Sequence, residues 1–425
     1  MNSLVNNSVE KIFITGEKKL TGSVNISGAK NAALPLMTLS LIINKDYNLY
    51  NVPDLVDTRL MSNLLIDLGI KINWKKGNLS FYGIPKKNEA SYDLVRQMRA
   101  SILVLGPLLA SKGSAKVPLP GGCAIGTRPI DLHIMVMESL GANITFDSGF
   151  IIGSLKNEGL KGAIINFPKV SVGATESAIM TAVLAKGQTK ILNAATEPEI
   201  SDLANCLNKA GANIEGIGTK NLIINGVEEL NKVSHSVVSD RIEAGSFAIA
   251  SSITMGNVEI NNINPKYLTE FINVLKLTGT KVQISNNSIN VSCSKRPRPF
   301  DVITDPYPGF PTDLQAQYMA LMAIADGKTL IKETIFENRF MHVPELMRMG
   351  AKISINNQEA EIYGVQKLKG AKVMASDLRA SMCLILGALA ASGTSEIDGL
   401  SHLDRGYENL VNKLANLGAI IKRSN

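Results

Sequence analysis

One short motif, in which a helical pattern ends at a glycine and runs into a β-branched strand, occurs six times along the 425 residues. The segments are LIDLGIKIN, MESLGANIT, LNKAGANIE, LKLTGTKVQ, MRMGAKISI and LANLGAIIK, and their glycines are Gly69, Gly141, Gly211, Gly279, Gly350 and Gly418. Glycine suits the left-handed position after a helix C-terminus, so each segment predicts a helix, a stop and a strand. Because the glycines recur about every 70 residues, we predict a six-fold structural repeat.

A second, more apolar helix is predicted before each glycine segment. Examples are MRASILVLGPLLAS and DLRASMCLILGALAAS, whose nearly all-round apolar character predicts burial against other helices and a sheet. A short strand separates the two helices, and two strands joined by a turn follow the glycine. Each unit therefore reads α-β-α-β-β, with a further strand entering the next unit, and the fold class is α/β.

The sixth unit breaks off at Lys422 without its final strands, and the N-terminal segment matches those strands. Residues 13–22, FITGEKKLTG, parallel residues 361–370, EIYGVQKLKG. We therefore expect residues 1–29 to complete the last unit. One domain would then span residues 30–238 and the other residues 1–29 plus 239–425, with three units each and a ligand cleft between them. A continuous solenoid without closure is the alternative.

Composition limits the classes of function. The net charge of +7 suits anionic small molecules, RNA or an anionic membrane. Aromatic residues make up only 5%, which disfavours a surface that stacks nucleic-acid bases. Four cysteines without a CxxC pair and four scattered histidines give neither a disulfide framework nor a zinc signature. The N-terminus lacks a signal-peptide core and the longest apolar stretch, residues 32–43, is too short to span a bilayer, so we expect a cytoplasmic protein without a membrane partner.

Basic residues stand where several helices are predicted to begin. Their positions are Lys30, Arg99, Arg128, Arg241, Arg339, Arg379 and Arg405. A cation is unfavourable at the positive end of a helix dipole unless an anion completes the arrangement. Pairing with a nearby carboxylate, such as Glu337, Asp377 or Asp404, is the alternative for any one of them. Their recurrence in both halves favours a shared anionic ligand.

The segment from Lys116 to His133 is rich in proline and glycine and leads into a helix at Pro129. Glycine-rich loops before a helix can cradle phosphate and can move as lids. Cys123 lies on this loop, close to a helix start and to Arg128, a setting that can lower the pKa of a thiol. The other cysteines, Cys206, Cys293 and Cys383, lie on apolar helices or a strand and are expected to be inert.

These segments resemble the enolpyruvyl transferase family, and within it the UDP-N-acetylglucosamine 1-carboxyvinyltransferases. The resemblance covers essentially the whole chain. It is carried by SGAKN at 27–31, PGGCAIGTRPIDLH at 120–133, FPTD at 310–313, FENRFMH at 336–342, DLRA at 377–380 and DRGY at 404–407. It implies an inside-out α/β barrel pair, with three copies of a βαβαββ unit in each domain.

The resemblance also implies a reaction. The 3-hydroxyl of UDP-N-acetylglucosamine displaces phosphate from phosphoenolpyruvate by addition and elimination, the first committed step of peptidoglycan biosynthesis, without cofactor or metal. Asp313 matches the family's general base, and it could also cap a helix starting at Leu314. Cys123 matches the acid that also forms a covalent adduct, and it predicts sensitivity to the epoxide fosfomycin. Lys30 and Arg405 complete the implied catalytic set.

The resemblance assigns binding residues as well. The cations matched to the phosphate are Lys30, Arg128 and Arg405. Those matched to the carboxylate and the charged intermediate are Arg339 and Arg379. The residues matched to the sugar nucleotide are Asn31, Arg99, Arg128, Pro129, Ile130, Asp131, Leu132, Lys169, Val170, Ser171, Val172, Asp313 and Ile335. Backbone N–H groups of residues 171–173 are expected to hold a diphosphate oxygen.

Two alternatives remain open beside this interpretation as a monomeric enzyme. An enzyme of the same fold acting on shikimate 3-phosphate is disfavoured by the cysteine loop around Cys123. A repeat module that binds RNA through basic residues is disfavoured by the low aromatic content and the lack of a lysine-rich stripe. We therefore expect no nucleic-acid partner.

Overall fold

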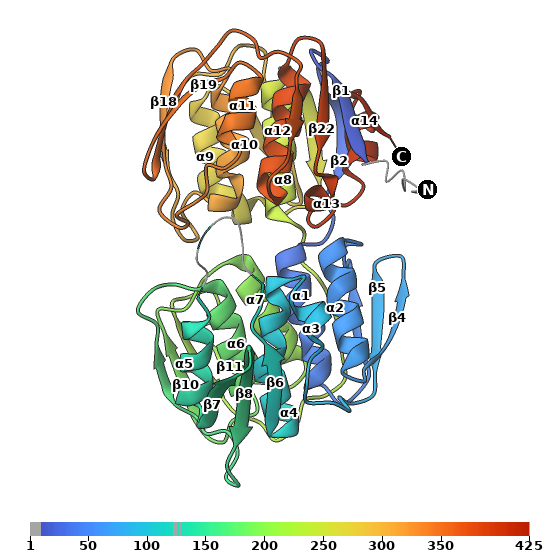
Figure 1. Cartoon of the computed structure of the whole chain (residues 1–425), viewed down its shortest axis with the longest axis vertical. Helices are drawn as coiled ribbons and strands as arrows, with labels where there is room; N and C mark the ends of the chain where they lie inside the picture. The colour runs from blue at the N-terminus through green and yellow to red at the C-terminus, as the bar shows by residue number, and fades with distance from the viewer. Residues whose placement is uncertain (1–9, 122–125, 127–128, 425) are drawn as a thin grey trace, which may run out of the picture. The chain divides into compact units, whose positions relative to one another are not determined.

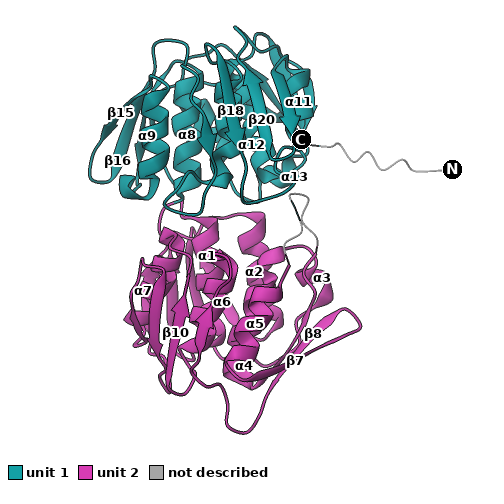
Figure 2. Ribbon diagram, turned by 90° about the vertical axis from the view of Figure 1, so that its left-hand side faces the viewer, with its two compact units in different colours: residues 1–26, 124–126, 240–425 teal, residues 27–123, 127–239 magenta. Residues whose placement is uncertain are grey.

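The computed structural model describes residues 10–121, 126 and 129–424. The chain divides into two compact units, coloured separately in Figure 2. Unit 1 contains the described residues up to Ile26 and those from Asp240 onward, whereas unit 2 contains Ser27 to Ser239 apart from part of the cysteine loop. The chain therefore enters unit 2 after Ile26 and returns to unit 1 after Ser239.

Unit 2 repeats one order of helices and strands three times. The first segment is α1 (Lys30–Thr38), η1 (Leu39–Leu41), β3 (Tyr47–Tyr50), α2 (Val56–Asp67), β4 (Lys71–Lys75) and β5 (Asn78–Tyr82). The second is α3 (Tyr92–Val95), η2 (Arg99–Val104), α4 (Leu105–Lys112), β6 (Ser114–Pro118), α5 (Asp131–Ser139), β7 (Ala142–Asp147), β8 (Phe150–Leu155) and β9 (Ile164–Asn166). The third is α6 (Val172–Ala182), β10 (Gln188–Leu192), α7 (Pro198–Lys209), β11 (Asn213–Glu215), β12 (Asn221–Asn225) and β13 (Val233–Ser236).

Unit 1 repeats the same order. Its first segment is α8 (Arg241–Ile253), β14 (Asn257–Asn261), η3 (Pro265–Leu268), α9 (Thr269–Leu277), β15 (Lys281–Ile284), β16 (Ser288–Ser292) and β17 (Val302–Ile303). The second is η4 (Thr312–Leu314), α10 (Gln315–Met322), β18 (Lys328–Lys332), α11 (Val343–Arg348), β19 (Lys352–Asn356), β20 (Glu359–Tyr363) and β21 (Lys372–Met374). The third is α12 (Leu378–Ala390), β22 (Thr394–Asp398), α13 (Leu400–Leu403), α14 (Leu410–Asn416) and β23 (Ile420–Ser424), followed in space by β1 (Lys11–Thr15) and β2 (Thr21–Asn25).

Strands exchanged between neighbouring segments close each unit into a ring. In most segments the last strand pairs in parallel with the first strand of the next, as β17 does with β18, whereas the first and second segments of unit 2 are joined by a parallel bridge between Glu89 and Lys116. In unit 2 the final strand β13 pairs in parallel with β3 of the first segment. In unit 1 the N-terminal β1 lies antiparallel between β22 and β23, and β2 pairs in parallel with β14 (Figure 1).

The six glycines of the sequence repeat terminate helices as predicted. Each follows the C-cap of the last helix of its segment, and all six have φ between 92° and 107°. Only glycine adopts this left-handed region at little steric cost, and the strand of the glycine segment begins within two residues of it.

One apolar helix of each segment (α1, α4, α6, α8, α10 and α12) lies in the core, and the sheets lie outside these helices (Figure 1). In unit 1 helices α8, α10 and α12 contact one another, and every residue of α8 is buried. Close packing requires a glycine where α8 meets η4, because a Cβ at Gly245 would lie 2.5 Å from a methyl carbon of Leu314. None of the helices in the described part of the chain combines the length and apolarity that a bilayer crossing requires.

Candidate active site

Asp313 lies in η4 of unit 1 and is held by two arginines. Arg339 donates from Nη2 to Asp313 Oδ1 at 2.6 Å, and Arg379 donates from Nη2 to Asp313 Oδ2 at 2.7 Å. The two arginine side chains are 4% and 7% exposed, whereas that of Asp313 is 26% exposed. Charge-assisted bonds to both oxygens fix the orientation of a carboxylate that solvent and ligand can still reach.

The sequence-based expectation that Asp313 caps a helix beginning at Leu314 is wrong. A 3-10 turn begins at Thr312 and the α-helix at Gln315, and neither N-terminus has a side-chain cap. The reason is electrostatic. The Asp313 carboxylate binds the guanidinium groups of Arg339 and Arg379 instead of a backbone N–H, and the local sequence does not show these distant partners. Although burial acts to lower it, the negative charge of Asp313 raises the pKa of the Arg379 guanidinium above its ordinary value.

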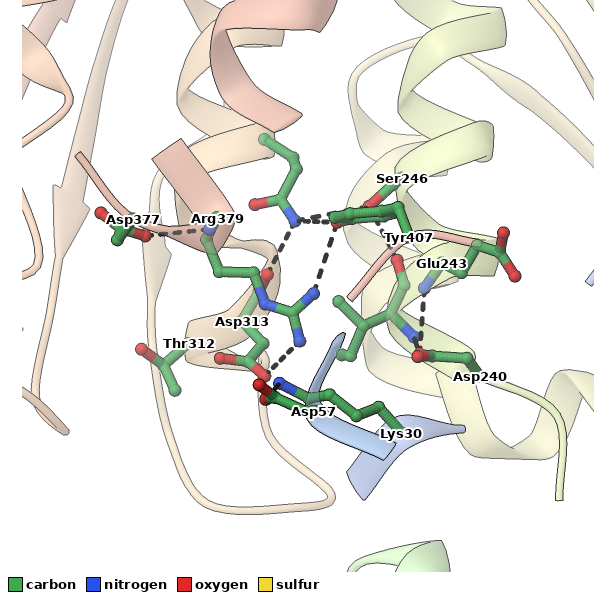
Figure 3. Close-up of polar contacts among 12 residues, drawn as sticks. Lys30, Asp57, Asp240, Glu243, Ser246, Thr312, Asp313, Asp377, Arg379 and Tyr407 are labelled. Atoms are coloured by element: carbon green, nitrogen blue, oxygen red, sulfur yellow. Dashed lines mark hydrogen bonds and ion pairs between the residues drawn. The ribbon is translucent and has the colours of Figure 1, made fainter. Parts of the chain in front are cut away.

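Tyr407 lies beside Arg379 in a buried polar network (Figure 3). Its hydroxyl accepts from Gln317 Nε2 at 3.1 Å, lies 2.9 Å from Ser246 Oγ and is 3.4 Å from Arg379 Nη1. Gln317 Nε2 also donates to the backbone oxygen of Asp313 at 2.8 Å. Burial raises the pKa of Tyr407, so its hydroxyl stays protonated in this network. Sequence reasoning assigned no role to Tyr407, Gln317 and Ser246, since two of them lie inside apolar helices.

Arg339 is supported by the chain segment that precedes it. Glu333 accepts a hydrogen bond from Thr312 Oγ1 at 2.9 Å and another from the backbone N–H of Ile335 at 2.9 Å. The Arg339 guanidinium carbon lies 5.3 Å from the centre of the Phe336 ring. Glu333 therefore joins η4 to the segment that carries Ile335 and Arg339.

Two of the basic residues do not open helices, contrary to the sequence-based expectation. Arg339 lies in a turn that ends before α11, and Arg405 lies in the turn between α13 and α14. Both residues were expected at helix starts because apolar periodicity indicates helices, but it does not show the turns that precede them. Arg241 does open α8, and Arg379 is the second residue of α12, whose N-cap is Asp377. Asp377 Oδ1 accepts from the backbone N–H of Arg379 at 2.9 Å and does not receive the guanidinium.

Lys30 lies in unit 2, where it opens α1. Its Nζ donates to Asp57 Oδ2 at 3.2 Å, and the side chain of Asp57 is only 4% exposed (Figure 3). The neighbouring Asn31 is exposed, and Arg99 opens η2 with a half-buried side chain. The buried carboxylate fixes Lys30 at the helix start.

The first turns of α5 and α6 lie side by side in unit 2. His133 Nδ1 of α5 is 2.8 Å from Ser177 Oγ of α6, and a Cβ at Gly173 would lie 3.2 Å from the His133 ring. Ser171 caps α6 by accepting from the backbone N–H of Ala174 at 3.3 Å. The matched residues Pro129, Ile130, Asp131, Leu132, Lys169, Val170, Ser171 and Val172 all lie at these two helix starts. Adjacent helix N-termini favour an anion, and His133 fits a packing role between the helices.

Cys123 and Arg128 lie outside the described residues. The other cysteines are buried, and burial raises the pKa of Cys206 to about 12 and raises that of Cys383 as well. Both therefore remain thiols near neutral pH. Within residues 10–121 and 129–424, no group of three histidine, cysteine, aspartate or glutamate side chains is arranged to hold a metal ion.

Comparison with known proteins identifies similar chains. A family profile described as EPSP synthase (3-phosphoshikimate 1-carboxyvinyltransferase) matches residues 14–414. A protein of Geobacter metallireducens named UDP-N-acetylglucosamine 1-carboxyvinyltransferase is 50% identical over 98% of this chain and 99% of its own. One of Pelagibacter ubique with the same name is 50% identical over 98% of this chain and 100% of its own.

Two solved structures share the fold. The enolpyruvyl transferase NikO from Streptomyces tendae has a TM-score of 0.88 at 22% identity, covering 98% of this chain and 99% of its own. An EPSP synthase from Acinetobacter baumannii has a TM-score of 0.75 at 18% identity, covering 98% and 100%. The predicted inside-out α/β fold is thereby confirmed.

Proposed function

Because the chain belongs to the EPSP synthase family of enolpyruvyl transferases, we propose that it transfers the enolpyruvyl group of phosphoenolpyruvate to the 3-hydroxyl of UDP-N-acetylglucosamine. The acceptor follows from relatives of that name, which are 50% identical over 98% of this chain. A shikimate 3-phosphate acceptor has less support, since the EPSP synthase structures are only 18% and 19% identical. The reaction opens peptidoglycan synthesis, and we place the protein in the cytoplasm as a monomer.

The proposed chemistry rests on Asp313 and the two arginines that bind it, Arg339 and Arg379. Addition requires a base that removes the proton of the 3-hydroxyl while its oxygen bonds to C2 of phosphoenolpyruvate and an acid protonates C3. Asp313 is the base, aimed by Arg339 and Arg379, and Cys123 is the acid. In the elimination the Cys123 thiolate takes back a proton from the new methyl group, the C2–C3 double bond forms again, and the bond from C2 to the phosphate oxygen breaks to release inorganic phosphate. Buried, preorganised guanidinium groups stabilise the negative charge of the tetrahedral intermediate.

Binding of the two substrates divides among the remaining matched residues. We assign the diphosphate of the sugar nucleotide to the adjoining starts of α5 and α6, where backbone N–H groups of Val172 and Gly173 point out of the helix. Lys30, Arg128 and Arg405 bind the phosphate of phosphoenolpyruvate. Asn31, Arg99 and Ile335 contact the sugar nucleotide.

Release of phosphate from phosphoenolpyruvate tests the proposal when it is measured with each acceptor separately. We expect release with UDP-N-acetylglucosamine and none with shikimate 3-phosphate. Asp313→Asn should lower kcat by on the order of a hundredfold or more while the far-UV circular dichroism stays native. Asp326→Asn is the matched control, because Asp326 pairs with Arg296 at the surface and its side chain is 75% exposed. Release with shikimate 3-phosphate alone, or full turnover by Asp313→Asn, would refute the assignment.

A further inference from the structure

The turn between α13 and α14, residues 404–409, presents Arg405 and is anchored at both ends. Its first residue, Asp404, contacts the C-terminal strand β23, and Tyr407 reaches the helical core of unit 1. Arg405 itself is half-buried between these anchors. The conformation of this turn therefore decides where the guanidinium of Arg405 is presented.

Arg423 of β23 forms the first anchor. Its Nη1 donates to Asp404 Oδ1 at 2.8 Å and its Nη2 donates to Asp404 Oδ2 at 2.7 Å. Its Nε donates to Glu10 Oε2 at 3.2 Å, beside the start of β1. A two-bond fork fixes both the distance and the plane of a carboxylate, which a single bond does not. Since the Arg423 side chain is 30% exposed, the contribution of this pair is mainly geometric.

Tyr407 and Gly406 form the second anchor. The Tyr407 hydroxyl is bonded to Gln317 and lies beside Ser246, as described above. A Cβ at Gly406 would lie 2.6 Å from a methyl carbon of Leu378, so the turn packs directly on the first residue of α12. With this end fixed to the core, a change at Asp404 acts on the residues between, which include Arg405.

We infer that Arg423 is a positioning residue that holds Arg405 in its phosphate-binding orientation through the fork to Asp404. The inference rests on the proposed function, in which Arg405 binds the phosphate of phosphoenolpyruvate. Loss of the fork lets the Asp404 end of the turn move while Tyr407 keeps the other end in place. Displacing a binding group by about 1 Å can cost on the order of a hundredfold in rate, so a shift of a fraction of that distance should still cost roughly tenfold.

Steady-state kinetics of Arg423→Gln, Arg423→Lys and Asp404→Asn test the inference. For Arg423→Gln we expect the KM for phosphoenolpyruvate to rise roughly tenfold, with the KM for the sugar nucleotide within about twofold of wild type. Arg423→Lys keeps the charge but not the fork, so it should fail to restore the KM. The double variant of Arg423→Gln and Asp404→Asn should raise the KM no further than Arg423→Gln alone, because that variant already removes the fork. Arg348→Gln is the control, since Arg348 pairs with Glu345 at an exposed position.

A purely structural role would lower the melting temperature and leave the KM for phosphoenolpyruvate unchanged, and that result would overturn the inference. Equal losses for both substrates would overturn it as well. Should wild-type protein release no phosphate, the proposed function fails, and calorimetric titration with phosphoenolpyruvate then tests the positioning role directly. Equal affinities of wild type and Arg423→Gln in that titration would refute it.

Discussion

His342 makes the stability of unit 1 depend on pH. It lies just before α11 and is 2% exposed. Burial lowers the pKa of His342 from 6.5 to about 4; the negative charge of Asp377 opposes this change and the positive charge of Arg339 adds to it. The imidazole is therefore neutral in the folded protein at pH 5 to 7, whereas in the unfolded chain it becomes protonated over this range.

The sign and size of the effect follow from linkage. Because the folded pKa lies below the unfolded one, the unfolded state binds the proton more tightly, and the free energy of unfolding falls as the pH falls. The contribution is fully present above the unfolded pKa of about 6.5 and is lost as the pH approaches about 4. Since each tenfold difference in proton affinity is worth roughly 1.4 kcal/mol, the loss is about 2 kcal/mol between pH 7 and pH 5 and about 3 kcal/mol by pH 4.

Urea unfolding followed by circular dichroism at pH 5, 6 and 7 measures this slope. His342→Asn removes the titrating ring while its amide can still meet the backbone of Arg339. We expect the variant to lose about 2 kcal/mol less than wild type between pH 7 and pH 5. His402→Asn, the same change at a half-buried histidine of α13, is the matched comparison variant. Identical slopes for wild type and His342→Asn would refute the reasoning.

Two further predictions concern close packing and thiol reactivity. Gly245→Ala would place a methyl group 2.5 Å from Leu314, next to Asp313, and should lower both kcat and the free energy of unfolding, the latter by about 1–3 kcal/mol. Gly387→Ala, whose nearest neighbour is a Leu346 methyl carbon at the longer distance of 3.2 Å, should destabilise the protein less and keep kcat. Urea titration and phosphate release compare the two variants. Fosfomycin should alkylate Cys123 and spare Cys206 and Cys383, because burial raises the pKa of both; peptide mass spectrometry locates the adduct, and one on another cysteine would contradict the assignment of Cys123.

Sequence reasoning predicted the repeat well because its signals are local. A capping glycine is required because one residue after the helix has a positive φ. A buried helix is indicated by apolar side chains within a few turns of the same helix. The match of residues 13–22 to residues 361–370 pointed to the N-terminal strands, which pair with β22, β23 and β14. These features need no knowledge of distant partners.

The polar contacts between residues of the candidate site could not be predicted from local sequence patterns. Ser246 and Tyr407 are 161 residues apart, and Arg379 and Asp313 are 66 apart, so no periodicity relates them. Asp313 satisfied a local rule for a helix cap, yet two distant guanidinium groups outweigh a cap contribution of about 1 kcal/mol. Family resemblance pointed to Asp313, Arg339 and Arg379 as candidates, whereas the contacts of Gln317 and Glu333 are seen only in the structure.

The position of β1 in the sheet of unit 1 affects the order in which the two units can fold during translation. This strand is synthesised before the other described strands, whereas its partners β22 and β23 are synthesised after them, and the paired residues Lys11 and Ser424 are separated by 413 positions. Unit 2 holds all of its strands within residues 27–239 and can finish folding while unit 1 is still being made. Joining Ser424 to Lys11 through a short linker and reopening the chain in a surface turn would yield a circular permutant that retains every strand pair.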